Sequence, residues 1–345
     1  MRSVKRMLKG AMVAFAYRSG LLELYLRRKL RGRAVVLTYH RVLPKERSAE
    51  SFSTDAIVVS PETFRRQMQL LRRLFTPLSA DDFAAALSTG RFPANACVVT
   101  FDDGWYDNAD YALPILRETA VPAVLFVATD YIGTDACFWQ ERLARALSAA
   151  RRIPDRSAAL FAELGASHVL DTSLTAAQAK LAIRAIIDRY KAQPQPEIDA
   201  LVRKVEGLLR EAGVAVDSQH PDRFLTWDQV KQLGSSGLVA IGSHCCTHTP
   251  LTKLDAGSVA AELRRSREII RERTGIDPSD LAYPNGDHDT HIARAVKDSG
   301  YRTAYTTNRG LVGPADDAFR LQRINIHEQS TDSDAAFMSR LAGLF

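Results

Sequence analysis

Short apolar runs alternate with amphipathic helical patterns along most of this 345-residue chain, and that alternation restricts the folds open to it. A strand, a helix and a further strand in succession favour a parallel sheet with helices packed outside it. The carboxyl ends of such strands converge on one face, as in a TIM-type barrel. The strand-like runs lie at 34–39, 96–101, 123–128, 237–242, 280–283, 301–306 and 321–326, and the helical patterns at 61–74, 80–88, 106–120, 226–235, 255–274 and 288–299.

The alternation is interrupted between Trp139 and about Pro221, where no strand-like run occurs. Apolar residues recur there at helical spacing, which predicts helices at 141–152, 174–192 and 197–212. We therefore expect a helical insertion at about 139–221 within an α/β domain that spans 34–345. Such an insertion serves as packing bulk, as an oligomer contact, or as a wall or lid over a substrate groove.

The run at 96–101 ends in Thr100-Phe101-Asp102-Asp103-Gly104. Neighbouring side chains in a strand point to opposite faces, so the strand has to end at the two acids if both serve one site. Gly104 permits the necessary turn. One carboxylate of such a pair can hold a metal ion while the other moves a proton.

The run at 237–242 leads into Ser243-His244-Cys245-Cys246-Thr247-His248. Two histidines four residues apart after a strand have the spacing of metal ligands, and imidazole suits zinc, iron, nickel or cobalt. Cys245 and Cys246 lie between them and either act as thiolate ligands or pack beneath the loop. The four cysteines of the chain do not suggest a disulfide-stapled secreted protein.

Together with Ala282-Tyr283-Pro284-Asn285-Gly286, these motifs follow an order that resembles the polysaccharide deacetylases with a NodB-homology domain, a carbohydrate esterase 4-like family with exopolysaccharide-associated members. Tyr39-His40-Arg41-Val42 also looks like the first strand of many members. The resemblance covers roughly residues 34–330. It implies a distorted (β/α)7 TIM-like barrel, here with a helical insertion.

The resemblance implies that Asp103, His244 and His248 bind one divalent metal ion, with Zn²⁺ expected before Co²⁺, Ni²⁺ or Mn²⁺. Such a ligand set leaves an open position for water. Asp102 would then be the general base that takes a proton from that water.

The resemblance also implies an oxyanion site at the backbone N–H of Asn285, with Tyr283 and Pro284 beside the substrate. His327 is the expected catalytic acid, because it follows the last strand-like run. His40 is a rival at the rim of the site, since it too ends a strand-like run. Two further histidines, His288 and His291, flank a probable helix start at Asp289-Thr290 and are expected to face solvent or the rim.

The chain departs from the family pattern at three positions. Ala282 stands where the family often has an arginine that orients the base, and Arg323 is the candidate replacement. Thr249 replaces a frequent proline, and Asn285 replaces a frequent tyrosine without removing the backbone N–H. The missing arginine leaves open a catalytically impaired relative that binds glycan or metal.

Charge is concentrated in residues 1–33, which contain ten Lys/Arg and one acid, a balance of +9, leaving −3 for the remainder. This distribution argues against a nucleic-acid-binding face on the barrel and fits an anionic membrane surface. An apolar stripe with helical spacing in this segment supports an interfacial amphipathic helix, although an ordinary basic helix docked on the barrel would look similar; its members are Val4, Met7, Leu8, Ala11, Met12 and Phe15.

The longest uncharged stretch, Gly10–Tyr17, is too short to span a bilayer and makes a poor signal peptide. We therefore expect a cytoplasmic protein, peripheral at the inner face of the membrane through residues 1–33, with its oligomeric state open. The predicted function is metal-dependent hydrolysis of N- or O-linked acetyl groups on a carbohydrate or polysaccharide. The alternatives are the impaired relative, a deacylase acting on another acyl-amide, and a membrane-surface adaptor.

Overall fold

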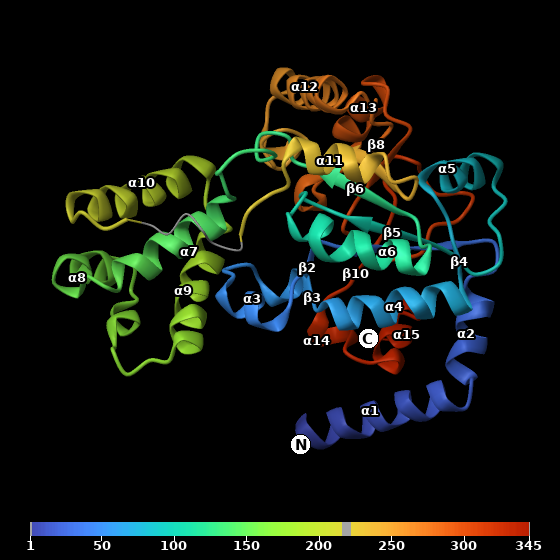
Figure 1. Cartoon of the computed structure of the whole chain (residues 1–345), viewed down its shortest axis with the longest axis horizontal. Coiled ribbons are helices and arrows are strands. Elements are labelled where there is room, and N and C mark those ends of the chain that lie inside the picture. The colour runs from blue at the N-terminus through green and yellow to red at the C-terminus, as the bar shows by residue number, and fades with distance from the viewer. Residues whose placement is uncertain (1, 216–221, 345) are drawn as a thin grey trace. The chain divides into compact units, whose positions relative to one another are not determined.

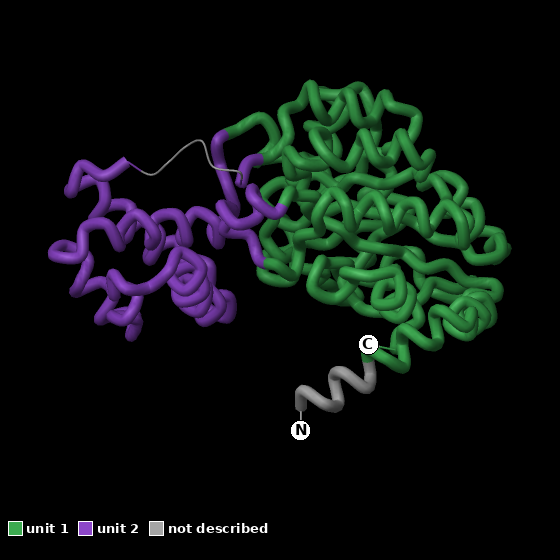
Figure 2. Tube along the Cα trace, turned by 60° about the horizontal axis from the view of Figure 1, so that its bottom comes forward, with its two compact units in different colours: residues 1–44, 55–134, 224–345 green, residues 45–54, 135–223 purple. Residues whose placement is uncertain are grey.

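The computed structural model describes residues 2–215 and 222–344, with side chains from Gly10 onward. The chain separates into two compact units (Figure 2). Unit 1 comprises residues 1–44, 55–134 and 224–345, and unit 2 comprises residues 45–54 and 135–223. The stripe residues Val4, Met7 and Leu8 and the predicted insertion boundary at Pro221 lie outside the described side chains.

Unit 1 is built on an eight-stranded sheet with the order β10-β1-β5-β6-β7-β8-β9 and with β4 paired to β5. The pairings between these strands are parallel. A single bridge between Tyr305 and Leu321 brings the chain before β10 against β9. The strands are β1 (Ala34–Tyr39), β4 (Thr76–Pro77), β5 (Ala96–Phe101), β6 (Ala123–Val127), β7 (Val239–Ser243), β8 (Asp280–Ala282), β9 (Thr303–Tyr305) and β10 (Ile324–Asn325).

The strands β1, β5 and β6 are buried at every residue, which explains their continuous apolar sequences. Their inner side chains, such as Val36, Val98 and Phe126, form one core cluster. Phe83 from α5 (Ala80–Thr89) joins this cluster beside Ala34 and Ala96, the first residues of β1 and β5. Helix α5 therefore packs at the amino-terminal end of the sheet.

Helices surround the sheet of unit 1 (Figure 1). Ser60 begins the first of them by accepting a hydrogen bond from the N–H of Thr63, and Pro61 occupies the first helical position. The α/β barrel predicted from the alternation of strands and helices is confirmed. The covering helices are α4 (Pro61–Leu74), α6 (Leu113–Thr119), α11 (Trp227–Gly234), α12 (Ala256–Thr274) and α13 (Thr290–Asp298).

The two ends of the chain lie together in unit 1. Helix α1 (Arg2–Arg18) and α2 (Leu21–Lys29) both contact α15 (Asp334–Leu341). Tyr17 donates a hydrogen bond to Asp334, and Lys29 donates to the carbonyl oxygen of Ala342. The short elements of unit 1 are β2 (Arg41–Val42), β3 (Val58–Val59) and α14 (Glu328–Thr331). No helix in the described part of the chain has the length and apolar content needed to cross a membrane.

Unit 2 is helical and has a core of its own. Leu147, Phe161, Ile183, Ile186 and Val205 are among its buried members. The side chain of Asp222 accepts hydrogen bonds from Ser51 and from the N–H of Phe52, which joins the two chain segments of the unit. Its helices are α3 (Lys45–Glu50), α7 (Trp139–Ala150), α8 (Pro154–Glu163), α9 (Ala176–Tyr190) and α10 (Gln195–Glu211).

Candidate metal and catalytic site

Three possible metal-binding side chains meet beyond the carboxyl ends of β5 and β7. Asp103 Oδ1 lies 3.4 Å from Nε2 of His244 and 3.4 Å from Nε2 of His248. The ligand atoms all lie within 4.8 Å of one another, and no second group of this kind occurs among the described residues. Asp103 and His244 are buried and His248 is partly buried, so this cluster is largely shielded from solvent.

The spacing and protonation of this cluster fit a small divalent ion. Two donors that each lie about 2.0–2.1 Å from a tetrahedral zinc are about 3.4 Å apart. Nδ1 of His244 lies 2.7 Å from the carbonyl oxygen of Ala282, so Nδ1 carries a proton and Nε2, which faces Asp103, is the nitrogen that could bind an ion. The donor set of one carboxylate and two imidazoles suits zinc and related divalent ions.

Burial and mutual hydrogen bonding set the charges of the cluster. Burial alone would raise the pKa of Asp103, but hydrogen bonds with His244 and His248 lower it well below its usual range. Burial lowers the pKa of His248, whereas for His244 it is outweighed by Asp103 and Asp102, which raise the pKa. Because the pKa of His244 is raised, protons compete with a metal ion for its Nε2, and metal affinity should fall as the pH is lowered.

Asp102, the other acid of the motif, forms an ion pair with Arg323. The two terminal nitrogens of Arg323 donate to Oδ1 and Oδ2 of Asp102, both at 2.7 Å. The Arg323 side chain is 1% exposed and that of Asp102 is 2% exposed. Burial would raise the pKa of Asp102, but the positive charges of Arg323 and His244 lower it, so the carboxylate stays ionised. Arg323 thus supplies the guanidinium beside Asp102 that an arginine at position 282 often supplies in the family pattern.

Trp105 supports the cluster, and the sequence analysis did not single it out. Its indole N–H donates to Asp103 Oδ2 at 2.8 Å, which leaves Oδ1 facing the two imidazoles. The ring stacks on Phe224 with centroids 4.3 Å apart, and the Arg41 guanidinium lies 4.3 Å from the ring centroid. The available signal was an aromatic residue directly after Gly104.

The loop between the two histidines is held from outside by Glu262 of α12. One carboxylate oxygen accepts the backbone N–H of Cys246 at 2.7 Å and that of Thr247 at 3.1 Å. Cys245 is buried in a core cluster, and burial raises the pKa of the Cys246 thiol to about 11. The structure therefore places both cysteines as protonated packing residues. Nothing in the sequence distinguishes Glu262 from other helical acids.

The turn after β8 carries the predicted oxyanion donor. The N–H of Gly286 donates to the carbonyl oxygen of Tyr283 at 2.7 Å, and Asn285 has a positive φ of 58°. Only glycine fits at position 286, because a Cβ there would lie 2.1 Å from Thr307 Oγ1. The Tyr283 hydroxyl donates to the carbonyl oxygen of Phe319, so that side chain belongs to the core.

Two candidate acids follow neighbouring strands. The N–H of Asp102 donates to the carbonyl oxygen of Tyr39, which places His40 beside Asp102 across the β1–β5 pairing. His327 follows β10, on the other side of β1. The positive charge of His40 lowers the pKa of Asp102 and of Asp103, whereas the charges that act on His327 come from Arg340 and Asp55.

The remaining predicted histidines have other environments. Nδ1 of His288 lies 2.9 Å from the carbonyl oxygen of Gly286, and its ring stacks on Tyr283. His291 is exposed on α13. Neither contributes a ligand atom to the cluster of the described residues.

Backbone strain is concentrated around this cluster. Six described residues other than glycine have positive φ, and four of them are Asp103, Cys245, His248 and Asn285. At Asp103 the value of 77° ends the strand, so that Asp102 reaches Arg323 while Asp103 reaches the histidines. Such conformations persist where the surrounding structure holds them, which is typical of functional sites.

Comparison with known proteins shows the family to which these motifs are similar. A family model described as polysaccharide deacetylase matches residues 89–304. A poly-beta-1,6-N-acetyl-D-glucosamine N-deacetylase of Staphylococcus epidermidis is 28% identical over 109 residues. That match covers 29% of this chain and only 38% of the length of the relative.

Solved structures share the fold at low sequence identity. The deacetylase PplD of Streptococcus pyogenes, solved with acetate, has a TM-score of 0.55 at 19% identity, covering 87% of this chain and 94% of that chain. IcaB from Ammonifex degensii has a TM-score of 0.56 at 18% identity, covering 89% of this chain and 97% of that chain. These similarities extend well beyond the residues that the family model matches.

Proposed function

The chain belongs to the polysaccharide deacetylase family, and on that premise we propose that it is a metal-dependent hydrolase that removes acetyl groups from a carbohydrate polymer. The observation that carries the proposal is the spacing of Asp103, His244 and His248, which fits one divalent ion. Zinc or a related ion, when bound, lowers the pKa of a water molecule and polarises the acyl oxygen. The name of the staphylococcal relative supports an N-acetylated exopolysaccharide as the substrate.

We propose Asp102 as the general base. Arg323 keeps this carboxylate ionised and fixes its plane, while each oxygen retains a lone pair that can accept a proton from the attacking water. The same contact disfavours a catalytically impaired relative, since the guanidinium absent at Ala282 is present beside the base.

The leaving amine or alcohol needs a proton. The sequence favours His327 as its donor, whereas the β1–β5 register supports His40, because it places His40 directly beside Asp102. We take His40 as the leading candidate and His327 as its rival. The backbone N–H of Asn285 is the proposed oxyanion donor, a contact that typically contributes about 10²–10³-fold to the rate.

Metal analysis combined with acetate release tests the proposal. The purified protein would be incubated with N-acetylated glycans, O-acetylated glycans and an acyl-amide that contains no sugar, before and after treatment with a chelator. We expect one divalent ion per chain and chelator-sensitive acetate release from a glycan. Metal binding without release from any substrate would favour the impaired relative, and release only from the third substrate would favour another deacylase.

A further inference from the structure

Exposed apolar side chains gather at the chain termini in unit 1. Met12 and Phe15 on α1 are 72% and 68% exposed, although the buried Leu22 and Leu26 show that α2 is firmly packed. Seven large hydrophobic side chains are exposed among the described residues, and all but Leu181 lie at this place: Met12, Phe15, Leu21, Leu24, Tyr25 and Leu344. The described part of the predicted apolar stripe therefore faces away from the barrel, unlike that of an ordinary docked helix.

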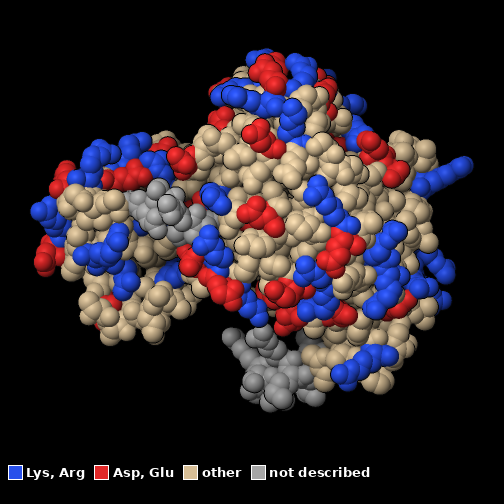
Figure 3. Space-filling model, viewed as in Figure 1, with Lys and Arg blue, Asp and Glu red and all other residues tan. Residues whose placement is uncertain are grey.

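Positive charge accompanies these side chains. Residues 1–33 contain ten Lys/Arg, and their one acid, Glu23, pairs with Arg27 at 2.6 Å. Elsewhere on the face shown in Figure 3, acidic and basic side chains are interspersed. The terminal segment is thus apolar and cationic at once, the combination found in helices that lie in a lipid interface.

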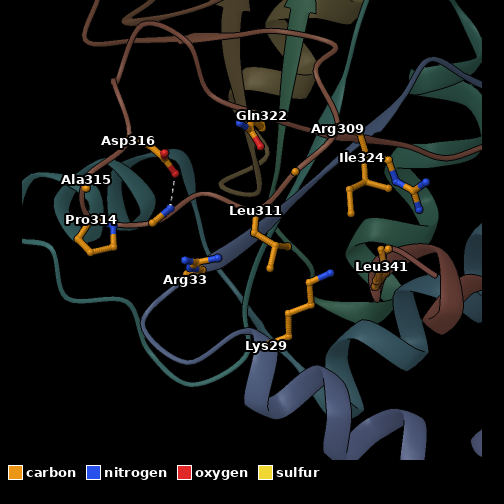
Figure 4. A pocket seen from close by; sticks show the side chains of 13 residues that line it. Lys29, Arg33, Arg309, Leu311, Pro314, Ala315, Asp316, Gln322, Ile324 and Leu341 are labelled. Atoms are coloured by element: carbon orange, nitrogen blue, oxygen red, sulfur yellow. Dashed lines mark hydrogen bonds between the residues drawn. The ribbon is translucent and has the colours of Figure 1, made fainter. Parts of the chain in front are cut away.

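A basic cavity of about 630 Å³ adjoins this segment. Lys29 and Arg33, which follow one another closely at the end of α2, and Arg309 from a distant stretch of the chain line it (Figure 4). Of the described residues in its lining, only Asp316 is acidic, and that carboxylate accepts the N–H of Gly313 at 2.7 Å. Lys29 Nζ lies 5.9 Å from the centre of the exposed Tyr25 ring, so the cavity and the apolar side chains are neighbours.

We propose that α1, α2 and the last residues of the chain form a docking face for an anionic lipid bilayer, with the basic cavity binding a headgroup phosphate. The apolar side chains would enter the interface while the cations meet the lipid charge. A second copy of the chain is a poor occupant, because the same +9 segment would oppose itself. This role is independent of the proposed deacetylation.

Vesicle sedimentation of the full chain tests the proposal, with phosphatidylcholine vesicles that contain or lack phosphatidylglycerol. The wild type should bind the anionic vesicles and be released by salt. Met12→Ser with Phe15→Ser should weaken binding by about tenfold or more, because two large apolar side chains no longer enter the interface. Arg33→Gln with Arg309→Gln should weaken binding to anionic vesicles by about tenfold.

Matched controls come from other exposed surfaces. Leu181→Ser removes an apolar side chain that is 69% exposed, and Arg264→Gln with Arg294→Gln removes arginines that are 69% and 83% exposed. These variants should bind vesicles as the wild type does. Acetate release from a soluble substrate should stay unchanged in every variant, so a failure of docking is distinguishable from a failure of the proposed function.

Four outcomes would overturn the proposal. Equal binding to vesicles with and without phosphatidylglycerol would contradict docking to an anionic bilayer. Wild-type binding by the Met12→Ser/Phe15→Ser variant would show that the apolar side chains of α1 do not enter the interface. A lipid-free dimer that this variant abolishes would assign the face to a second copy. Inorganic phosphate that binds the cavity without competing with vesicles would reassign the cavity to a free anion.

Discussion

Two aspartates at opposite ends of the sheet, Asp102 and Asp280, each form a bidentate ion pair with an arginine, yet their surroundings differ. Arg323 and Asp102 are almost fully buried beyond the carboxyl end of β5, with the His244 imidazole close enough to lower the pKa of the carboxyl. Arg302 donates to both oxygens of Asp280, the first residue of β8, at 3.0 and 2.9 Å. Arg302 is 35% exposed and also pairs with Asp81 at the start of α5.

The comparison shows that a bidentate ion pair is a poor indicator of catalysis by itself. Both pairs have the geometry expected of a strong structural contact. Of the two pairs, only that of Asp102 lies beside possible metal ligands and residues with strained backbone. Asp280 instead accepts a hydrogen bond from the Thr303 hydroxyl and lies toward the amino end of the sheet. The residues that neighbour an ion pair, rather than its geometry, therefore indicate whether it takes part in catalysis.

The largest effect should come from removing the imidazoles, which have no counterpart beside Asp280. His244→Ala with His248→Ala should lose the metal and nearly all acetate release, because one carboxylate alone holds zinc poorly. The exposed His291→Ala is the control and should keep both. Full metal occupancy in the double variant would remove these histidines from the site.

The next effect separates the two aspartates directly. Asp102→Asn should keep the metal and lower turnover by about 10²–10⁴-fold, as expected for loss of a general base. Asp280→Asn breaks the matching pair and should change turnover little. Equal turnover losses in both variants would mean that Asp102 acts only through stability.

Stability should distinguish the two arginines. Arg323→Met leaves a buried carboxylate unpaired and should lower the free energy of unfolding by about 3–5 kcal/mol. Arg302→Met should lower the free energy of unfolding by less, because solvent reaches the Arg302–Asp280 pair. The pKa of Asp102 is lowered in the folded state, so its stabilisation is present above about pH 4 and is lost as the pH falls through the folded pKa. Urea unfolding at neutral and acidic pH should therefore show the gap between wild type and Arg323→Met narrowing in acid.

The candidate acids define a smaller effect. His40→Gln should lower turnover by about 10²-fold, and more for the more basic of two leaving groups, because the proton matters most there. His327→Gln should have little effect if its ring only packs at the rim. The reverse order of the two variants would restore His327 as the acid.

The smallest effect concerns the support of Asp103. Trp105→Phe keeps an aromatic ring but removes the indole N–H that donates to Asp103 Oδ2, so metal affinity should fall by about tenfold. Metal titration measures this change. Unchanged affinity would make Trp105 a packing residue alone.

The sequence predicts the early strands well because both of their faces are buried. The runs 34–39 and 96–101 match β1 and β5, whose side chains are apolar on both sides. The run 321–326 shrinks to Ile324–Asn325, because the preceding chain meets β9 through one bridge at Leu321. Helix α15 at Asp334–Leu341 was not predicted at all.

The site is predictable as a set of residue types but not as a set of contacts. Asp103, His244 and His248 are recognisable from local motifs, and the structure brings them together. Arg323 could be nominated because Ala282 departs from the family pattern, yet only the fold shows its guanidinium on Asp102. Local spacing cannot report a contact made through the closing strand of a barrel.

That contact has a consequence for how the protein is made. Asp102 is synthesised 221 residues before Arg323, which flanks the last strand of the sheet. A carboxylate in a dry interior without its arginine is unfavourable, so the end of β5 should stay hydrated until the C-terminal segment docks. A nascent or prematurely terminated chain that stops before Arg323 would carry all three expected metal ligands without an oriented base. Activity should therefore appear only after Arg323 has been synthesised and has reached Asp102.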